Sequence, residues 1–92
     1  MINKECDFAL RISGDSMEPL LSNSDLVYVE KVSELELGQI GIFLLNGESL
    51  CKRLGETDGK TTLLSVNPAY APIVVLDSDD LRLVGRVIAP EK

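Results

Sequence analysis

The chain contains no histidine among its 92 residues. This absence excludes the catalytic sites that need an imidazole base, including the Ser-His-Asp and Cys-His arrangements, and it excludes histidine as a metal ligand. Any enzyme chemistry of this chain must therefore use serine, lysine, cysteine, aspartate or glutamate.

Positive charge is also scarce in the sequence. The 9 lysine and arginine residues stand against 15 aspartate and glutamate residues, which gives a net charge of −6 and a pI near 4.5. Proteins that bind the phosphate backbone of DNA usually carry the opposite charge. We expect this chain to make no DNA contact by itself, so that binding to DNA would need a further domain.

The chain has only two cysteines, Cys6 and Cys51, and they form no CxxC motif. Without a histidine nearby they predict neither a zinc site nor a thioredoxin-like site. Two buried free thiols are the expected state, and a single disulfide is the alternative. We predict no cofactor and no metal site.

Long apolar segments are missing as well. No run approaches the roughly 20 residues of a membrane-spanning helix, and residues 1–5 lack the apolar centre of a signal peptide. The 45% of hydrophobic residues can nevertheless form one small core. These features predict a single soluble domain over residues 1–92, located in the cytoplasm and without a membrane partner.

The sequence does contain short apolar runs separated by turn-forming residues, a pattern typical of β-strands. The predicted strands are residues 8–12, 26–29, 40–45, 48–54, 61–64, 73–76 and 83–88. Asn46-Gly47 and Asp58-Gly59 predict tight hairpins, because a type I′ turn needs positive φ at both central residues. We expect a mostly β fold of antiparallel strands curled into a small, partly open barrel or sandwich, with at most one short helical turn at 17–21.

Lys52 occupies an unusual place for a lysine, within a predicted hairpin strand. Alternate residues share one face of a strand, so Lys52 lies in a row with Leu50 and Leu54, while Cys51 points the other way. Apolar neighbours lower the pKa of a lysine from about 10.4, as a lysine general base requires. The alternative is a side chain that extends from the strand end into water.

Ser16 lies in the segment Gly-Asp-Ser-Met-Glu-Pro at 14–19, where a glycine and a proline predict a sharp turn of the main chain. The N–H groups of the serine and its neighbour can point the same way in such a turn and hold an oxyanion. A serine nucleophile needs a base within hydrogen-bond reach, and a neutral lysine can replace histidine in that role. The alternative is that Asp15 or Ser16 serves only as a helix N-cap.

Four segments, in this order, resemble the C-terminal catalytic domain of LexA-like repressors, peptidase family S24. They are Gly-Asp-Ser-Met-Glu-Pro at 14–19, Cys-Lys-Arg-Leu at 51–54, Ser-Val-Asn-Pro-Ala-Tyr-Ala-Pro-Ile at 65–73 and Leu-Val-Gly-Arg-Val-Ile at 83–88. The resemblance covers residues 8–88, with Ser16 placed 36 residues before Lys52. The family includes LexA, UmuD and the phage repressors that cleave themselves during the SOS response.

The resemblance implies that Ser16 is the nucleophile, that neutral Lys52 is its base, and that the backbone N–H groups of Ser16 and Met17 hold the oxyanion. It also implies a homodimer and a RecA-type filament as co-protease. Relatives cleave an Ala-Gly or Cys-Gly bond of their own chain, and neither dipeptide occurs here. We therefore expect a fragment of a longer SOS or prophage repressor, without its cleavage loop and its DNA-binding domain.

Other reactive residues give weaker predictions. Cys51 could act as a nucleophile, but its row of the strand offers no base. Asp15 and Glu18 could form an acid pair, although carboxylates at the start of a helical turn ordinarily stabilise its positive end. The acidic segment 77–80 lacks the spacing of a calcium loop, which favours a solvated turn.

Two other functions stay open beside the self-cleaving peptidase. The fold could serve only as a dimerisation and sensing module, with cleavage lost. It could also be a signal-peptidase-type endopeptidase, since that family shares the fold and the Ser-Lys pair with the family that this chain resembles. The lack of a membrane anchor and the Asn-Pro-x-Tyr-x-Pro segment at 67–72 favour the repressor branch.

Overall fold

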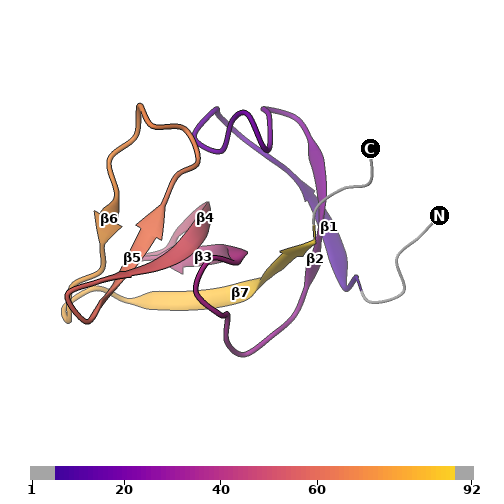
Figure 1. Cartoon of the computed structure of the whole chain (residues 1–92). Helices are drawn as coiled ribbons and strands as arrows, with labels where there is room; N and C mark the ends of the chain where they lie inside the picture. The colour runs from indigo at the N-terminus through magenta and orange to yellow at the C-terminus, as the bar shows by residue number, and fades with distance from the viewer. Residues whose placement is uncertain (1–5, 89–92) are drawn as a thin grey trace.

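The computed structural model describes residues 6–88, which form seven strands and no helix (Figure 1). The strands are β1 (Phe8–Arg11), β2 (Leu26–Glu30), β3 (Ile40–Leu45), β4 (Glu48–Thr57), β5 (Lys60–Leu64), β6 (Ile73–Val74) and β7 (Leu81–Ile88). All neighbours pair antiparallel in one sheet of order β1-β2-β7-β3-β4-β5-β6, which does not close into a barrel. The predicted mostly β, partly open architecture is confirmed.

Both predicted hairpins are present. Asn46 and Gly47 have φ angles of 52° and 87°, and Asp58 and Gly59 have φ angles of 52° and 78°, so each pair has the positive φ that a type I′ turn requires. The second turn allows pairing to continue to Thr57, so β4 is longer than the predicted strand 48–54. These two turns fix the register of β3, β4 and β5.

The core is formed by residues of β2, β3 and β7 together with the segment between β1 and β2. Val27 and Val29 of β2 are fully buried, and Met17 and Leu21 of the connecting segment are each 1% exposed. The continuous apolar run at 26–29 predicts a strand buried on both faces, but Leu26 is 39% exposed, so this prediction is wrong for β2. Alternate residues point to opposite faces, and only one face of this strand packs on the core.

The first half of β4 has one unpaired side within the described structure. Residues 48–52 pair with β3, whereas β5 pairs only with the part of β4 from Arg53 onward. β1 likewise pairs with β2 on one side only. Besides the outer side of β6, the open sheet therefore leaves two strand edges unpaired within the described residues, and one of them carries Lys52.

Candidate active site

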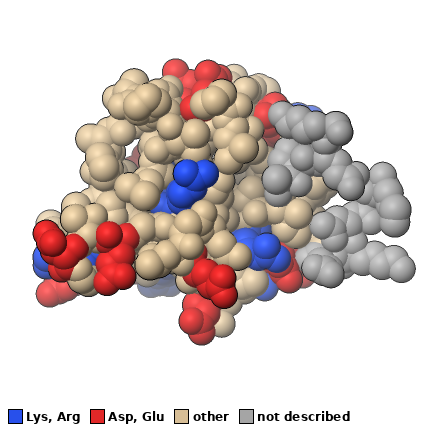
Figure 2. Space-filling model, viewed as in Figure 1, with Lys and Arg blue, Asp and Glu red and all other residues tan. Residues whose placement is uncertain are grey.

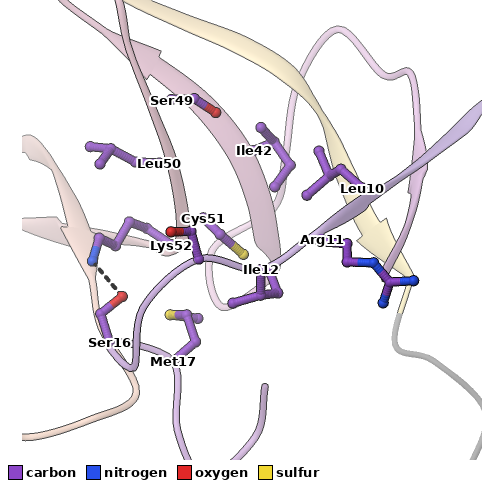
Figure 3. Close-up of a pocket in the computed structure, with 11 residues that line it drawn as sticks. Leu10, Arg11, Ile12, Ser16, Met17, Ile42, Ser49, Leu50, Cys51 and Lys52 are labelled. Atoms are coloured by element: carbon purple, nitrogen blue, oxygen red, sulfur yellow. Dashed lines mark hydrogen bonds between the residues drawn. The ribbon is translucent and has the colours of Figure 1, made fainter. Parts of the chain in front are cut away.

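Ser16 and Lys52, which come from separate parts of the chain, meet in the structure. The Nζ of Lys52 lies 3.0 Å from the Oγ of Ser16, within hydrogen-bond distance (Figure 3). Lys52 extends from β4, and Ser16 lies in the turn between β1 and β2. This contact gives the serine hydroxyl a proton acceptor whenever the amine is neutral.

The turn that carries Ser16 has the sharp main chain that its sequence predicts. Gly14 has a φ of +89°, a conformation that glycine adopts at little cost, and its N–H donates to Oδ1 of Asn23 at 2.8 Å. The N–H of Leu21 donates to the carbonyl of Met17 at 2.9 Å, which forms the one short turn expected at 17–21. Met17, buried beside Ser16, anchors this turn to the core.

Neither expected N-cap is formed at that turn. The hydroxyl of Ser16 contacts Lys52, and the carboxylate of Asp15 accepts a hydrogen bond from the hydroxyl of Tyr70. The same contact raises the pKa of Tyr70. Asp15 is therefore engaged by the loop at 65–72, and it forms no acid pair with Glu18.

Lys52 is a buried lysine. Its residue is 7% exposed, and burial lowers the pKa of its ammonium group, against smaller opposing effects from the charges of Cys51 and Glu48. Burial disfavours the charged form because water no longer solvates it fully. The alternative in which this side chain extends into water is wrong, because its amine contacts the hydroxyls of Ser16 and Ser65 and lies beside the ring of Tyr70.

A second hydroxyl reaches the same amine. The Oγ of Ser65 lies 2.8 Å from the Nζ of Lys52, and the ring of Tyr70 has its centroid 5.7 Å from that nitrogen. Ser65 directly follows β5, and Tyr70 lies in the loop that continues from it. The amine is thus held among two hydroxyl groups and one aromatic ring.

A groove leads away from the Ser16–Lys52 contact, as Figure 3 shows. Its volume is about 230 Å³, and it is lined by residues 10–13 on one side and residues 49–52 on the other, with Ser16, Met17 and Ile42 between them. These two sides belong to the end of β1 and to the unpaired side of β4. The groove therefore runs along two strand edges whose backbone N–H and C=O groups are free to pair with another strand.

Compared with protein-family models, the sequence matches the Peptidase S24-like family over residues 1–88. The chain belongs to this family. It is a family of serine peptidases, and the resemblance noted from the sequence segments is confirmed.

Relatives of this S24 chain include proteins named LexA repressor. The LexA repressor of Syntrophotalea carbinolica is 37% identical over 96% of this chain and 44% of its own length. LexA repressor 2 of Pseudomonas syringae pv. tomato is 40% identical over 86% of this chain and 40% of its own length. This chain thus spans less than half the length of these relatives.

The S24 resemblance implies that the backbone N–H groups of Ser16 and Met17 hold the oxyanion, and within residues 6–88 both are free to donate. Among the residues that the structure describes, no acceptor is paired with the N–H of Ser16 or of Met17. Within the described residues the N–H of Asp15 has no acceptor either, whereas Gly14 donates to Asn23 and Glu18 donates to the carbonyl of Asp15 at 3.2 Å. Three successive donors, those of Asp15, Ser16 and Met17, are therefore left near the hydroxyl of Ser16.

Cys51 has the properties of a core residue of the S24 domain. It packs against the buried cluster, and burial raises the pKa of its thiol to about 11, in spite of the nearby Lys52 charge. At neutral pH it is a thiol, whereas a nucleophile needs the thiolate. Cys6 and Cys51 are both free, as expected, but each is half-buried and not fully buried, and the Sγ of Cys6 donates to the carbonyl of Phe8.

The acidic segment near the C-terminus of the S24 domain forms a turn against the first hairpin. Asp79 accepts hydrogen bonds from the N–H of Leu76 and the amide of Asn46, which lower its pKa. Asp80 forms an exposed ion pair with Arg82 at 3.2 Å. The prediction of a solvated turn is confirmed, and residues 6–88 contain no group of three potential metal ligands close enough to share an ion.

Sequence reasoning missed Ser65. Its signal was present in the Asp58-Gly59 turn, because counting pairs back from Thr57 and Lys60 places Arg53 opposite Leu64 and then Lys52 opposite Ser65. Side chains that face each other across an antiparallel pair lie on the same side of the sheet. The strand register alone could therefore have predicted that the hydroxyl of Ser65 lies near the amine of Lys52.

Charge is distributed on the surface in a way that matches the composition. On the face shown in Figure 2, lysine and arginine side chains of the described residues are scattered among acidic ones and form no continuous basic surface. The described residues include no helix long and apolar enough to cross a membrane.

Proposed function

We propose that this chain is the Ser-Lys peptidase domain of a LexA-like transcriptional repressor, with Ser16 as the nucleophile and Lys52 as the general base. The observation that carries the proposal is the 3.0 Å contact between the Ser16 hydroxyl and a buried lysine amine whose pKa is lowered. Membership of a serine peptidase family and relatives named LexA repressor support it.

The proposed reaction begins with neutral Lys52. Ser16 Oγ forms a bond to the carbonyl carbon of a peptide, while its proton moves to the Nζ of Lys52. The N–H groups of Ser16 and Met17 stabilise the negative oxygen of the tetrahedral intermediate. The carbon–nitrogen bond then breaks as Lys52 returns its proton to the leaving amine, and water hydrolyses the acyl-serine with Lys52 again acting as base.

The peptide in this proposal binds as an added strand along β4. In a two-residue hairpin, Leu45 and Glu48 exchange hydrogen bonds with each other, and bonding pairs then alternate along the strands. The N–H and C=O groups of Ser49 and Cys51 therefore face away from β3 and into the groove. An extended peptide can pair with them, with its scissile carbonyl beside Ser16.

Peptide cleavage tests the proposal. The chain is incubated with a synthetic peptide that carries an Ala-Gly bond, between about pH 7 and pH 10, and the products are identified by mass spectrometry. We expect cleavage that accelerates with pH in the wild type and is lost in both Ser16→Ala and Lys52→Ala. Equal cleavage by either variant would show that the site lies elsewhere.

We further propose that the domain forms a homodimer, as expected from the resemblance. The edges of β1 and β6, unpaired within the described sheet, offer surfaces on which a second copy could pair. Sedimentation of the chain should show mass increasing with concentration, and a monomer at all concentrations would contradict this part of the proposal. DNA contact through a further domain and a RecA-type filament as co-protease stay predictions.

A further inference from the structure

Ser65 is the closer of the two hydroxyl partners of Lys52. Its Oγ lies 2.8 Å from Nζ, compared with 3.0 Å for the Oγ of Ser16. The register of β4 and β5, which pairs Arg53 with Leu64, places Ser65 opposite Lys52 at the point where the two strands separate. The contact thus follows from the hairpin geometry and involves a residue outside the Ser-Lys pair.

The orientation of a neutral amine matters for a base. Neutral lysine has two N–H bonds and one lone pair, and only the lone pair can accept the proton of Ser16. A hydroxyl that accepts one N–H bond fixes the rotation about the terminal carbon–nitrogen bond. At 7% exposure Lys52 meets little water that could do the same. Ser65 is positioned to accept that N–H bond.

An uncharged hydrogen-bond partner also leaves the amine of Lys52 able to act as a base. The titratable groups near Lys52 are Cys51, Glu48 and Tyr70, with Asp15 bound to the hydroxyl of Tyr70, and the negative charge of Glu48 already favours the ammonium form. A carboxylate at position 65 would favour that form further and remove the base at neutral pH. A serine hydroxyl orients the amine without adding a charge.

We propose that Ser65 is a positioning residue, which accepts an N–H bond from neutral Lys52 and thereby directs the lone pair of Nζ at the hydroxyl of Ser16. The inference rests on the proposed Ser-Lys function and adds to it a third side chain that the reaction needs for its full rate. It assigns to Ser65 no bond with the substrate.

The test measures how fast Ser16 reacts with a fluorophosphonate probe, which needs no peptide substrate. The Oγ of Ser16 forms a bond to phosphorus, fluoride leaves, and the proton of the hydroxyl passes to Lys52. Intact-mass spectrometry gives the rate against pH for the wild type and for Ser65→Ala, Ser65→Thr, Ser65→Asp and Ser33→Ala. Ser33 is an exposed serine between β2 and β3 and serves as the matched control.

We expect Ser65→Ala to lower the maximal labelling rate about tenfold, the effect of one lost hydrogen bond. Its pH midpoint should move down, because a hydroxyl acceptor stabilises the ammonium form more than the neutral amine. Ser65→Asp should move the midpoint up for the same electrostatic reason. Ser65→Thr and Ser33→Ala should keep the profile of the wild type. A loss of folding alone would produce no such opposed shifts.

Two results would overturn the inference, and they differ from a failure of the proposed function. If Ser65→Ala labels with the rate and the pH midpoint of the wild type, Ser65 does not position Lys52. The same holds if Ser65→Thr loses as much rate as Ser65→Ala. Either result would leave the proposed Ser-Lys pair unaffected. Labelling of the wild type that does not depend on Lys52, shown with Lys52→Ala, would overturn both.

Discussion

The main-chain N–H of Asn67 donates to the carbonyl of Ser16 at 2.9 Å. The side-chain amide of the same asparagine donates to the carbonyl of Asp15 at 3.0 Å, and its Oδ1 accepts from the N–H of Ala69. One residue of the loop at 65–72 therefore holds two successive carbonyls of the turn that carries Ser16. Tyr70 adds a third connection through its bond to Asp15.

Replacing Asn67 should slow the reaction of Ser16 without preventing it. Asn67→Ala removes the side-chain bond and leaves the main-chain bond, so we expect a loss of about tenfold in the fluorophosphonate labelling rate. Asn67→Asp keeps the acceptor for Ala69 but loses the donor to Asp15, and should be at least as slow. Wild-type labelling rates in both variants would show that this loop does not position Ser16.

Gly14 should resist substitution because of its backbone alone. An added Cβ would meet nothing within 4 Å, but the φ of +89° is one that other residues adopt at a cost. We expect Gly14→Ala to lower the free energy of unfolding by about 1–2 kcal/mol, measured by urea denaturation, and Gly14→Asn to lower it less, since asparagine tolerates positive φ. A larger loss for asparagine than for alanine would contradict this explanation.

The thiol of Cys51 should be inert in the folded protein. Its pKa of about 11 leaves little thiolate near neutral pH, and alkylation requires the thiolate. We expect iodoacetamide to modify Cys51 at a small fraction of the rate that it shows in denaturant, as measured by peptide mass spectrometry. Equal rates in the folded and denatured protein would contradict the raised pKa of this thiol.

The lowered pKa of Lys52 should also make the free energy of unfolding depend on pH. Burial lowers this pKa in the folded state, so between the lowered value and the unfolded value of about 10.4 the unfolded chain binds more protons. The stability contributed by Lys52 therefore rises with pH in that window and is lost below it. Urea denaturation should show the wild type gaining stability relative to Lys52→Met as the pH rises.

The exposed Leu37, which carries no titratable group, provides the control for that experiment. Leu37→Met should differ from the wild type by an amount that does not change with pH in the same window. A difference between the wild type and Lys52→Met that stays constant, or that moves the other way, would mean that the folded state does not disfavour the ammonium form.

The strands of this fold could be predicted because their local signals agree. Asn46-Gly47 and Asp58-Gly59 specify turns by their φ angles, and the apolar runs on either side supply the strands. The extent of a strand could not be predicted equally well, since β4 continues to Thr57 only because β5 pairs with it. The exposure of Leu26 depends on which face of β2 packs on the core, a property of the assembled sheet.

The candidate site could likewise be predicted only in part from the sequence. The absence of histidine and the row of Leu50, Lys52 and Leu54 led to the lysine, and the turn at 14–19 led to Ser16. Their contact across 36 residues is a property of the tertiary structure. The roles of Asn67 and Tyr70 toward Asp15 could not be predicted, because hydrogen bonds between two loops leave no periodic pattern in a sequence.

The central claim is that neutral Lys52 is the base for Ser16, and a titration of Lys52 by NMR tests it most directly. The chemical shift of its side-chain carbon next to Nζ, followed against pH, gives the pKa of that amine, which is then compared with the pH midpoint of Ser16 labelling. We predict that the two values coincide and lie below about 10.4. A Lys52 pKa at or above that value, or a Ser16 reactivity that stays constant while Lys52 titrates, would contradict the account.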